Sequence, residues 1–276
     1  MTARSQLLVD DRLRAALSTG PRPPRPSALG ASLVFAWRSV LKVKHVPEQL
    51  GDVLAIPIIF TLLFTYLFGG AVAGTTADYL RFLLPGTLVM TILLLTMYTG
   101  IGLNADIATG VFDRYRSLPL WRPAPIVGAL IGDIGRYLAA STLVLGIGGA
   151  MGYRPDGGPT GVLAALALIL IFAFGLSWIW TTLALIMRTP GAVMNLGTAV
   201  LFPLTMASNV FVDPDTTPGW LQAIIRINPV THLVTAVRDL ANGTAAPSQA
   251  AWVLLATAVL VVLFAPLTMW LYRIKE

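Results

Sequence analysis

Long apolar segments alternate with short polar ones along most of the chain. Six of these segments are long enough for an α-helix to cross a hydrocarbon core about 30 Å thick, which takes about 20 residues. They lie at about 51–72, 84–105, 125–150, 160–187, 191–212 and 249–272. Only helices and closed β-barrels span a membrane, and the strict apolar–polar alternation of barrel strands is missing here. The pattern therefore predicts an all-α integral membrane protein with six transmembrane helices.

Composition supports a membrane protein and limits its chemistry. Hydrophobic residues make up 56% of the 276 residues and charged residues only 12%, whereas about 25% is usual for a soluble domain. The chain has no cysteine and two histidines, His45 and His232. Disulfides and thiolate or histidine metal clusters are thereby excluded, so we expect no metal site.

The region before the first predicted span divides into two parts. Residues 1–30 are rich in arginine and proline, which is typical of a solvated, disordered tail. Residues 31–46 have the period of an amphipathic helix, with one face formed by Leu33, Val34, Trp37, Val40 and Leu41. We expect this helix to lie in the membrane interface, although a cytoplasmic extension of the first span is the alternative. The membrane domain then occupies 47–276.

A second irregular region precedes the last predicted span. Between 216 and 243 the chain holds two stretches with apolar faces, separated by Asn228 and Pro229 and closed by Asn242 and Gly243. Each stretch is too short to cross a membrane. We therefore expect two short re-entrant or interface-lying helices there.

The distribution of basic residues predicts the orientation. One set of loops and ends carries fourteen Lys and Arg residues, including the N-terminal region, the 106–122 loop and the C-terminus. The other set carries four, at Arg81, Arg154, Arg226 and Arg238. Cytoplasmic loops are enriched in basic residues. Both termini and the 106–122 loop are therefore expected in the cytoplasm, and the net charge of +6 reflects anionic lipid rather than nucleic acid.

Motifs for catalysis are missing. A phosphate-binding loop needs a glycine directly before its lysine, and Lys42, Lys44 and Lys275 all lack one. The zinc protease motif needs a glutamate between two histidines, and the only glutamates are Glu48 and Glu276. We therefore expect a protein that is not an enzyme and binds no cofactor itself.

Asp133 and Arg136 are charged residues inside the third predicted span. Charges at mid-span are costly, about 2.5–3.5 kcal/mol each on insertion scales, and residues three apart share a helix face. The spacing predicts an intramembrane ion pair. It is either structural or, as the alternative, part of a proton relay. Nearby, Gly128 and Gly132 permit a close helix contact.

The loop at 106–122 carries an unusual density of charged and aromatic residues. A short polar helix is expected there, stopped by proline, and its length exceeds what a simple connection needs. Its residues suit docking to another protein or to this chain's own interfacial helix. They are Phe112, Asp113, Arg114, Tyr115, Arg116, Ser117, Leu118 and Pro119.

With these motifs in order, the chain resembles the permeases of ABC-2 type exporters, and particularly the daunorubicin- and doxorubicin-resistance membrane subunits. The resemblance rests on Leu63–Gly70, Leu84-Pro85-Gly86, the run Asp113–Pro119, and Asn228-Pro229 with Arg238 beyond. It implies a half-transporter that couples through 112–119 to a separate ABC ATPase holding ATP and Mg. It also implies a second permease copy, identical or related, in a bacterial cell membrane. The cargo would be an amphipathic drug, antibiotic or lipid.

Residues that could contact such a cargo are adaptable or polar groups of the first, second and fifth spans. They are Phe64, Tyr66, Met97, Tyr98, Met206 and Asn209. Methionine suits loosely specified apolar ligands, but helix packing explains these residues as well, and an aromatic belt explains the first two. A proton-coupled carrier using Asp133 and a non-transporting scaffold remain as alternative functions.

Overall fold

A computed structural model describes residues 27–45, 48–111, 121, 123–244 and 247–274. This part of the chain is helical, with connecting turns and one short 3-10 helix at Pro214–Thr216. Its α-helices are α2 (Ala28–His45), α3 (Glu48–Ala73), α4 (Thr76–Ala108), α6 (Ala124–Ala150), α7 (Gly158–Ile186), α8 (Pro190–Met206), α9 (Gly219–Ile227), α10 (Pro229–Ala241) and α11 (Pro247–Ile274). The predicted all-α class is confirmed.

Among the described residues, four helices are long and apolar enough to cross a membrane: α4, α6, α7 and α11. They account for four of the six predicted spans. The other two predicted spans coincide with α3, whose described apolar part is Pro57–Leu67, and with α8, which has 17 residues. The chain is thus a multi-pass membrane protein, and a count of six stays a prediction.

Two helices have bounds that differ from those of the predicted spans. α4 begins at Thr76, eight residues before the predicted start at 84; Thr75 caps it by accepting from the Asp78 amide, and Pro85 is accommodated inside. α8 ends at Met206 rather than 212. The chain beyond Met206 leaves the helix to pack on α4, where the Tyr79 hydroxyl donates to the Phe211 carbonyl at 3.1 Å.

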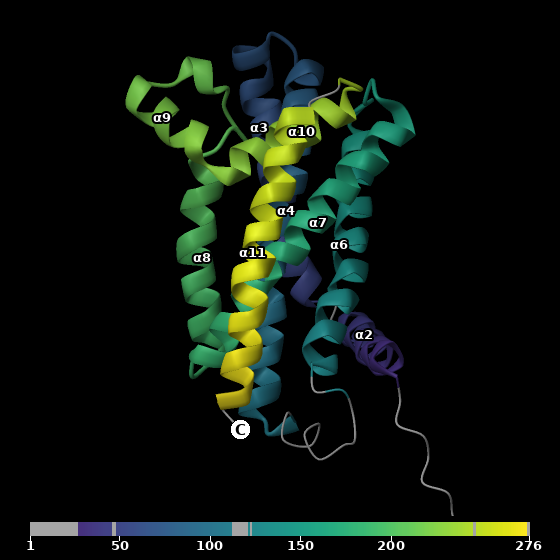
Figure 1. Cartoon of the computed structure of the whole chain (residues 1–276). Coiled ribbons are helices and arrows are strands. Elements are labelled where there is room, and N and C mark those ends of the chain that lie inside the picture. The colour runs from purple at the N-terminus through teal and green to yellow at the C-terminus, as the bar shows by residue number, and fades with distance from the viewer. Residues whose placement is uncertain (1–26, 46–47, 112–120, 122, 245–246, 275–276) are drawn as a thin grey trace, which may run out of the picture.

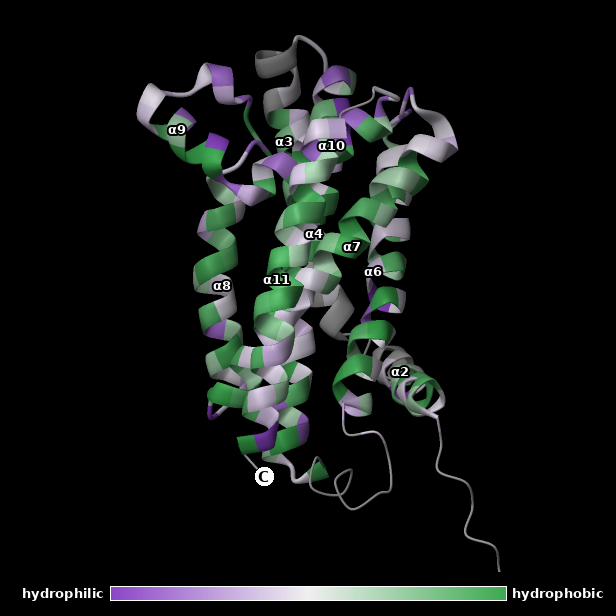
Figure 2. Cartoon of the chain, viewed as in Figure 1, coloured by the Kyte–Doolittle hydropathy of each residue, from purple (hydrophilic) through white to green (hydrophobic). Residues whose placement is uncertain are grey.

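α4 is the central element of the bundle. It packs against α3, α6, α7, α8 and α10, and most of its apolar window is buried. Two glycines permit this crowding, because a Cβ on Gly86 would lie 2.9 Å from the Val210 carbonyl oxygen and one on Gly100 would lie 2.6 Å from that of Trp180. α11, by contrast, buries little of its apolar window. Figure 2 shows apolar residues along the middle of the bundle and polar residues gathered toward its ends.

Short helices occupy both ends of the bundle (Figure 1). α2 lies across the bundle near the end where α11 finishes, and it packs on α6. α9 and α10 lie at the opposite end. α10 is buried among α4, α7 and α11 through an apolar face that includes Leu233, Val234 and Val237. α9 leaves Trp220 and Ile227 exposed.

Candidate functional site: a buried ion pair, two end anchors and an apolar groove

A charged pair lies inside the bundle on α6. The Arg136 guanidinium contacts Asp133 Oδ1 at 2.9 Å, and both side chains are less than a tenth exposed. Asp133 lies nine positions after α6 begins, about 14 Å along the helix axis at 1.5 Å per residue. Because each partner neutralises the other, the pair reduces the energy required to hold two charges among apolar helices.

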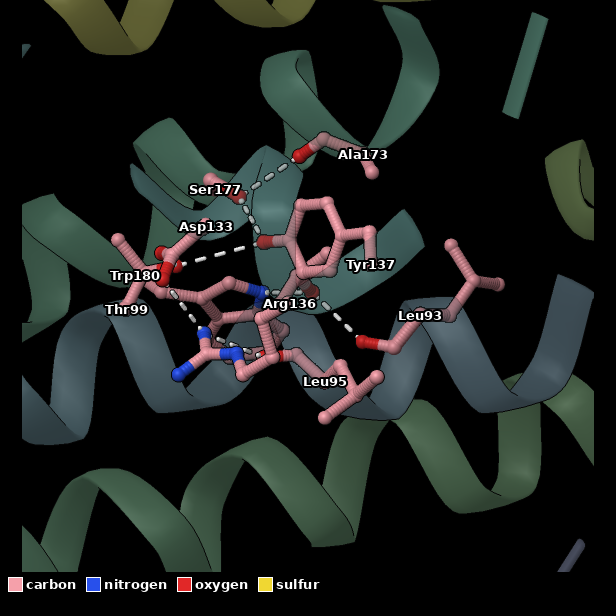
Figure 3. Close-up of polar contacts among 10 residues, drawn as sticks. Leu93, Leu95, Thr99, Asp133, Arg136, Tyr137, Ala173, Ser177 and Trp180 are labelled. Carbon is pink, nitrogen blue, oxygen red and sulfur yellow. Dashed lines mark hydrogen bonds and ion pairs between the residues drawn. The ribbon is translucent and has the colours of Figure 1, made fainter. Parts of the chain in front are cut away.

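The neighbouring helices α4 and α7 supply further polar contacts (Figure 3). Thr99 of α4 donates a hydrogen bond to Asp133 Oδ2, and Arg136 donates to the Leu95 carbonyl at 3.2 Å. The Tyr137 hydroxyl lies 3.1 Å from Ser177 Oγ of α7 and 3.5 Å from Thr99 Oγ1. These contacts join α4, α6 and α7 at one level of the bundle.

A buried tryptophan adds a further hydrogen bond between α7 and α4. Trp180 of α7 is almost fully buried and donates from Nε1 to Thr96 Oγ1 of α4 at 2.8 Å. A tryptophan in the middle of an apolar segment is uncommon, because this residue usually lies at the membrane surface. That position is the one sequence signal for this contact, whereas nothing in the sequence pairs Thr99 or Ser177 with α6.

Close helix packing and an ion pair between described residues hold the α2 end of the bundle. A Cβ on Gly128 of α6 would lie 2.6 Å from the Ser32 carbonyl, and one on Gly132 would lie 2.8 Å from the Ala36 carbonyl. Arg38 of α2 contacts Asp106, near the end of α4, at 3.1 Å. The apolar face of α2 points away from these contacts, with Leu33, Val34 and Trp37 mostly exposed. α2 is therefore attached to both α6 and α4.

The opposite end is anchored by Asn228 and Arg238. Asn228 Nδ2 donates to the carbonyls of Leu204 and Ala207 at 2.7 Å each, and its Oδ1 accepts from the Val230 amide at 2.9 Å. The Asn228 side chain thus forms hydrogen bonds with carbonyl groups at the end of α8 and with an amide at the start of α10. Backbone groups at helix ends otherwise have no partner within the helix.

Arg238 of α10 continues this anchor into α4. It donates to the Phe82 carbonyl at 3.2 Å from Nε and 2.9 Å from Nη2, to the Asn209 carbonyl at 3.1 Å, and stacks 3.8 Å from the Phe82 ring centroid. Burial lowers the pKa of Arg238 to about 10, against the opposing influence of Asp213 and Asp239. The group therefore keeps its charge near neutral pH.

A groove of about 470 Å³ runs between α7, α8 and α11. This volume is within the range of small-molecule pockets, about 300–1,000 Å³. The side chains that line it are Leu93, Phe172, Leu176, Ile179, Trp180, Leu183, Leu196, Val200, Leu201, Leu204, Pro229, Val230, Trp252, Leu255, Ala256, Val259 and Leu260. No residue predicted to contact cargo is among them.

The six predicted cargo residues are dispersed. Phe64 packs on Phe60 and Phe211, whereas Tyr66 is exposed. Met97 is buried against Gly197, and the Tyr98 ring lies 5.7 Å from the Arg136 guanidinium carbon. Met206 is partly exposed at the end of α8, and Asn209 donates to Thr235 Oγ1 at 2.9 Å. Their contact with cargo stays a prediction.

The predicted coupling segment, 112–119, lies outside the described residues. The adjoining backbone is described on both sides. α4 finishes at Ala108, Gly110 takes a left-handed conformation at φ 69°, and α6 begins at Ala124. The role of 112–119 in docking an ATPase also stays a prediction.

The described residues form a multi-pass helical bundle with a transverse helix at one end and two short helices at the other. The family model described as ABC-2 type transporter matches residues 31–241, and the chain belongs to this family. The resemblance inferred from the motifs is confirmed.

Three relatives show the range of similarity. The chain is 46% identical over 275 residues to the daunorubicin resistance ABC transporter permease protein DrrB1 of Streptomyces coeruleorubidus, covering 100% of this chain and 97% of that protein. It is 23% identical to the probable doxorubicin resistance ABC transporter permease protein DrrC of Mycobacterium tuberculosis H37Rv, and the match covers 79% of this chain and 82% of that protein. It is 25% identical to the inner membrane transport permease YadH of Escherichia coli K12, and the match covers 67% of this chain and 73% of that protein. This chain is accordingly a transporter permease subunit and not an enzyme.

Proposed function

We propose that this permease exports an amphipathic drug or antibiotic from a bacterial cell, driven by ATP hydrolysis on a separate ABC ATPase. The observation that carries the proposal is the 46% identity to a daunorubicin resistance permease over the full chain. The working unit contains two permeases and two ATPases. α3 and α8 add two membrane crossings to the four long apolar helices, and both termini lie in the cytoplasm.

The ATPase docks at 112–119 and its motion reaches the bundle through α4 and α6, the helices on either side of that segment. Two features of the described residues support this route. α2 is packed against α6 and paired to α4 by Arg38 and Asp106. The Asp133–Arg136 pair joins α6 to α4 and α7, so a displacement of α6 is transmitted to both.

The proton-coupled alternative would require Asp133 to bind and release protons during transport. Its two carboxylate oxygens are already engaged by Arg136 and Thr99. These contacts hold the carboxylate between α6 and α4, which supports a structural role for the pair.

The test uses the permease co-expressed with its ATPase and reconstituted in liposomes. Arg114→Glu with Arg116→Glu should leave membrane insertion intact and abolish cargo-stimulated ATP hydrolysis, because the charge-assisted contacts to the ATPase are reversed in sign. Arg226→Glu, on α9 in the region predicted to face the other side of the membrane, is the matched control and should retain stimulation. Unchanged stimulation in the double variant would overturn the coupling assignment.

A further inference from the structure

The groove between α7, α8 and α11 is an apolar surface that the export proposal does not use. α8 packs mainly on α4 and has only limited contact with α7, and Figure 1 shows it standing beside α11. Several groove side chains are half exposed in the single chain, including Val200 at 50% and Leu255 at 54%. In a membrane, such a surface is in contact with hydrocarbon.

The lining restricts the chemistry of an occupant. Every side chain of the groove is apolar except for the indole nitrogens of Trp180 and Trp252, and Trp180 Nε1 already donates to Thr96. A polar group placed along this lining would lose its hydrogen bonds without replacement, which costs about 2–7 kcal/mol. The occupant must therefore be hydrocarbon along most of its length.

Polar groups lie beside the lining residue Trp252 at the α10 end of the groove. At the α10 end, the Trp252 ring stacks on His232 with centroids 6.3 Å apart, and His232 Nδ1 lies 2.8 Å from Gln249 Oε1. Trp252 is 60% exposed, and tryptophan with polar neighbours is typical of the membrane–water interface. A ligand with an apolar chain and a polar head would place its head there.

We propose that the groove binds one acyl chain of a membrane phospholipid, whose headgroup lies beside Trp252, His232 and Gln249. The alternatives fit less well. A helix of a second copy is about 10–12 Å across with its side chains, so it would cover the groove rather than enter it. A polycyclic drug with hydroxyl or amine groups would bury them without partners.

The bound chain fills the space between α8 and α11 and completes the packing of α8. Leu196, Val200 and Leu204 lie on the α8 side of the groove, while Leu255 and Val259 lie on the α11 side. Contacts through the lipid replace direct contacts between these helices, so that α8 is held on one side by α4 and on the other by hydrocarbon.

The test is photocrosslinking of the full-length chain in liposomes of phosphatidylethanolamine and phosphatidylglycerol, with a trace of phosphatidylglycerol carrying a diazirine on one acyl chain. Peptide mapping should place crosslinks in 196–204 of α8 and 252–260 of α11. Ala256→Phe fills the groove, whereas Ala258→Phe is its matched control because Ala258 is exposed on α11 and does not line the groove. Labelling should fall about tenfold in Ala256→Phe, a change that corresponds to about 1.4 kcal/mol, and stay unchanged in Ala258→Phe.

A second pair of variants keeps the test decisive if Ala256→Phe fails to fold. Val200→Phe fills the groove from α8, and Ala199→Phe is its exposed control. Equal labelling of a folded groove variant and its control would overturn the proposal. So would loss of labelling on addition of daunorubicin, which would assign the groove to cargo. The chain has no cysteine, so a disulfide between two Val200→Cys chains would reveal a second copy instead. No readout depends on export.

Discussion

Removing one partner of the buried ion pair should destabilise the permease far more than removing both. The perturbation is a double-mutant cycle with Arg136→Gln, Asp133→Asn and the combined variant. Each single variant leaves one charge inside the bundle without its counterion, whereas the combined variant leaves two neutral groups that can hydrogen-bond to each other. The difference between the summed single effects and the combined effect measures the coupling.

The geometry sets the expected magnitude. At the 2.9 Å separation and an effective dielectric constant of about 20, the Coulomb attraction is about 6 kcal/mol. Desolvation offsets part of it, so that breaking a buried pair by removing one partner costs about 3–5 kcal/mol. We expect each single variant to lower the free energy of unfolding by that amount and the combined variant to lower it by less, so that the coupling exceeds about 3 kcal/mol.

The assay is SDS-driven unfolding in mixed micelles, followed by circular dichroism. The matched control is the cycle for Arg81 and Asp156, whose nearest atoms are 3.9 Å apart and whose side chains are 49% and 70% exposed. An exposed pair contributes about 0–1 kcal/mol. A coupling below about 0.5 kcal/mol for Asp133 and Arg136, equal to that of the control, would refute the assignment of this pair as a structural link between helices.

Three further substitutions test the other contacts by the same unfolding measurement. Gly132→Ala should lower the free energy of unfolding by about 1–3 kcal/mol, because the new Cβ would lie 2.5 Å from the Cβ of Ser39. A Cβ on Gly146 of the same helix meets no other atom, so the control Gly146→Ala should be neutral or stabilising. Equal effects of the two variants would contradict the tight α2–α6 packing. Arg238→Met should lower the free energy of unfolding by about 1–3 kcal/mol, because the carbonyls of Phe82 and Asn209 lose their donor. An unchanged free energy of unfolding would show that this anchor is dispensable. Trp180→Phe removes the hydrogen bond to Thr96 and should lower the free energy of unfolding by about 1 kcal/mol. A larger loss would indicate that the packing of the indole ring contributes more than its hydrogen bond.

The helices were predictable from the sequence because their apolar lengths match a membrane. Sequence spacing also placed Asp133 beside Arg136, since residues three apart share a helix face. α8 ends six residues before the predicted end of the fifth span, because Asn228 and Arg238 bind the carbonyls at and beyond the end of the helix from more than twenty residues away. Hydrogen bonds from such distant residues to the carbonyls at a helix end leave no signal in the sequence around that end.

The groove escaped prediction for a different reason. Its lining residues, such as Leu196 and Val259, have the same apolar character as side chains that face lipid, so composition does not separate a groove from an open surface. Likewise, Thr99 and Ser177 become partners of the α6 cluster only through the crossing of three helices. These features depend on tertiary packing, which a single sequence pattern does not encode.

The most direct test of ATP-driven export is cargo uptake into inverted liposomes that contain the purified permease with or without its ATPase. An amphipathic drug cargo, probed with daunorubicin, should accumulate only when the permease, the ATPase and MgATP are all present, and collapse of the proton gradient should not affect its accumulation. Accumulation by the permease alone, driven by a proton gradient and lost in Asp133→Asn, would contradict ATP-driven export.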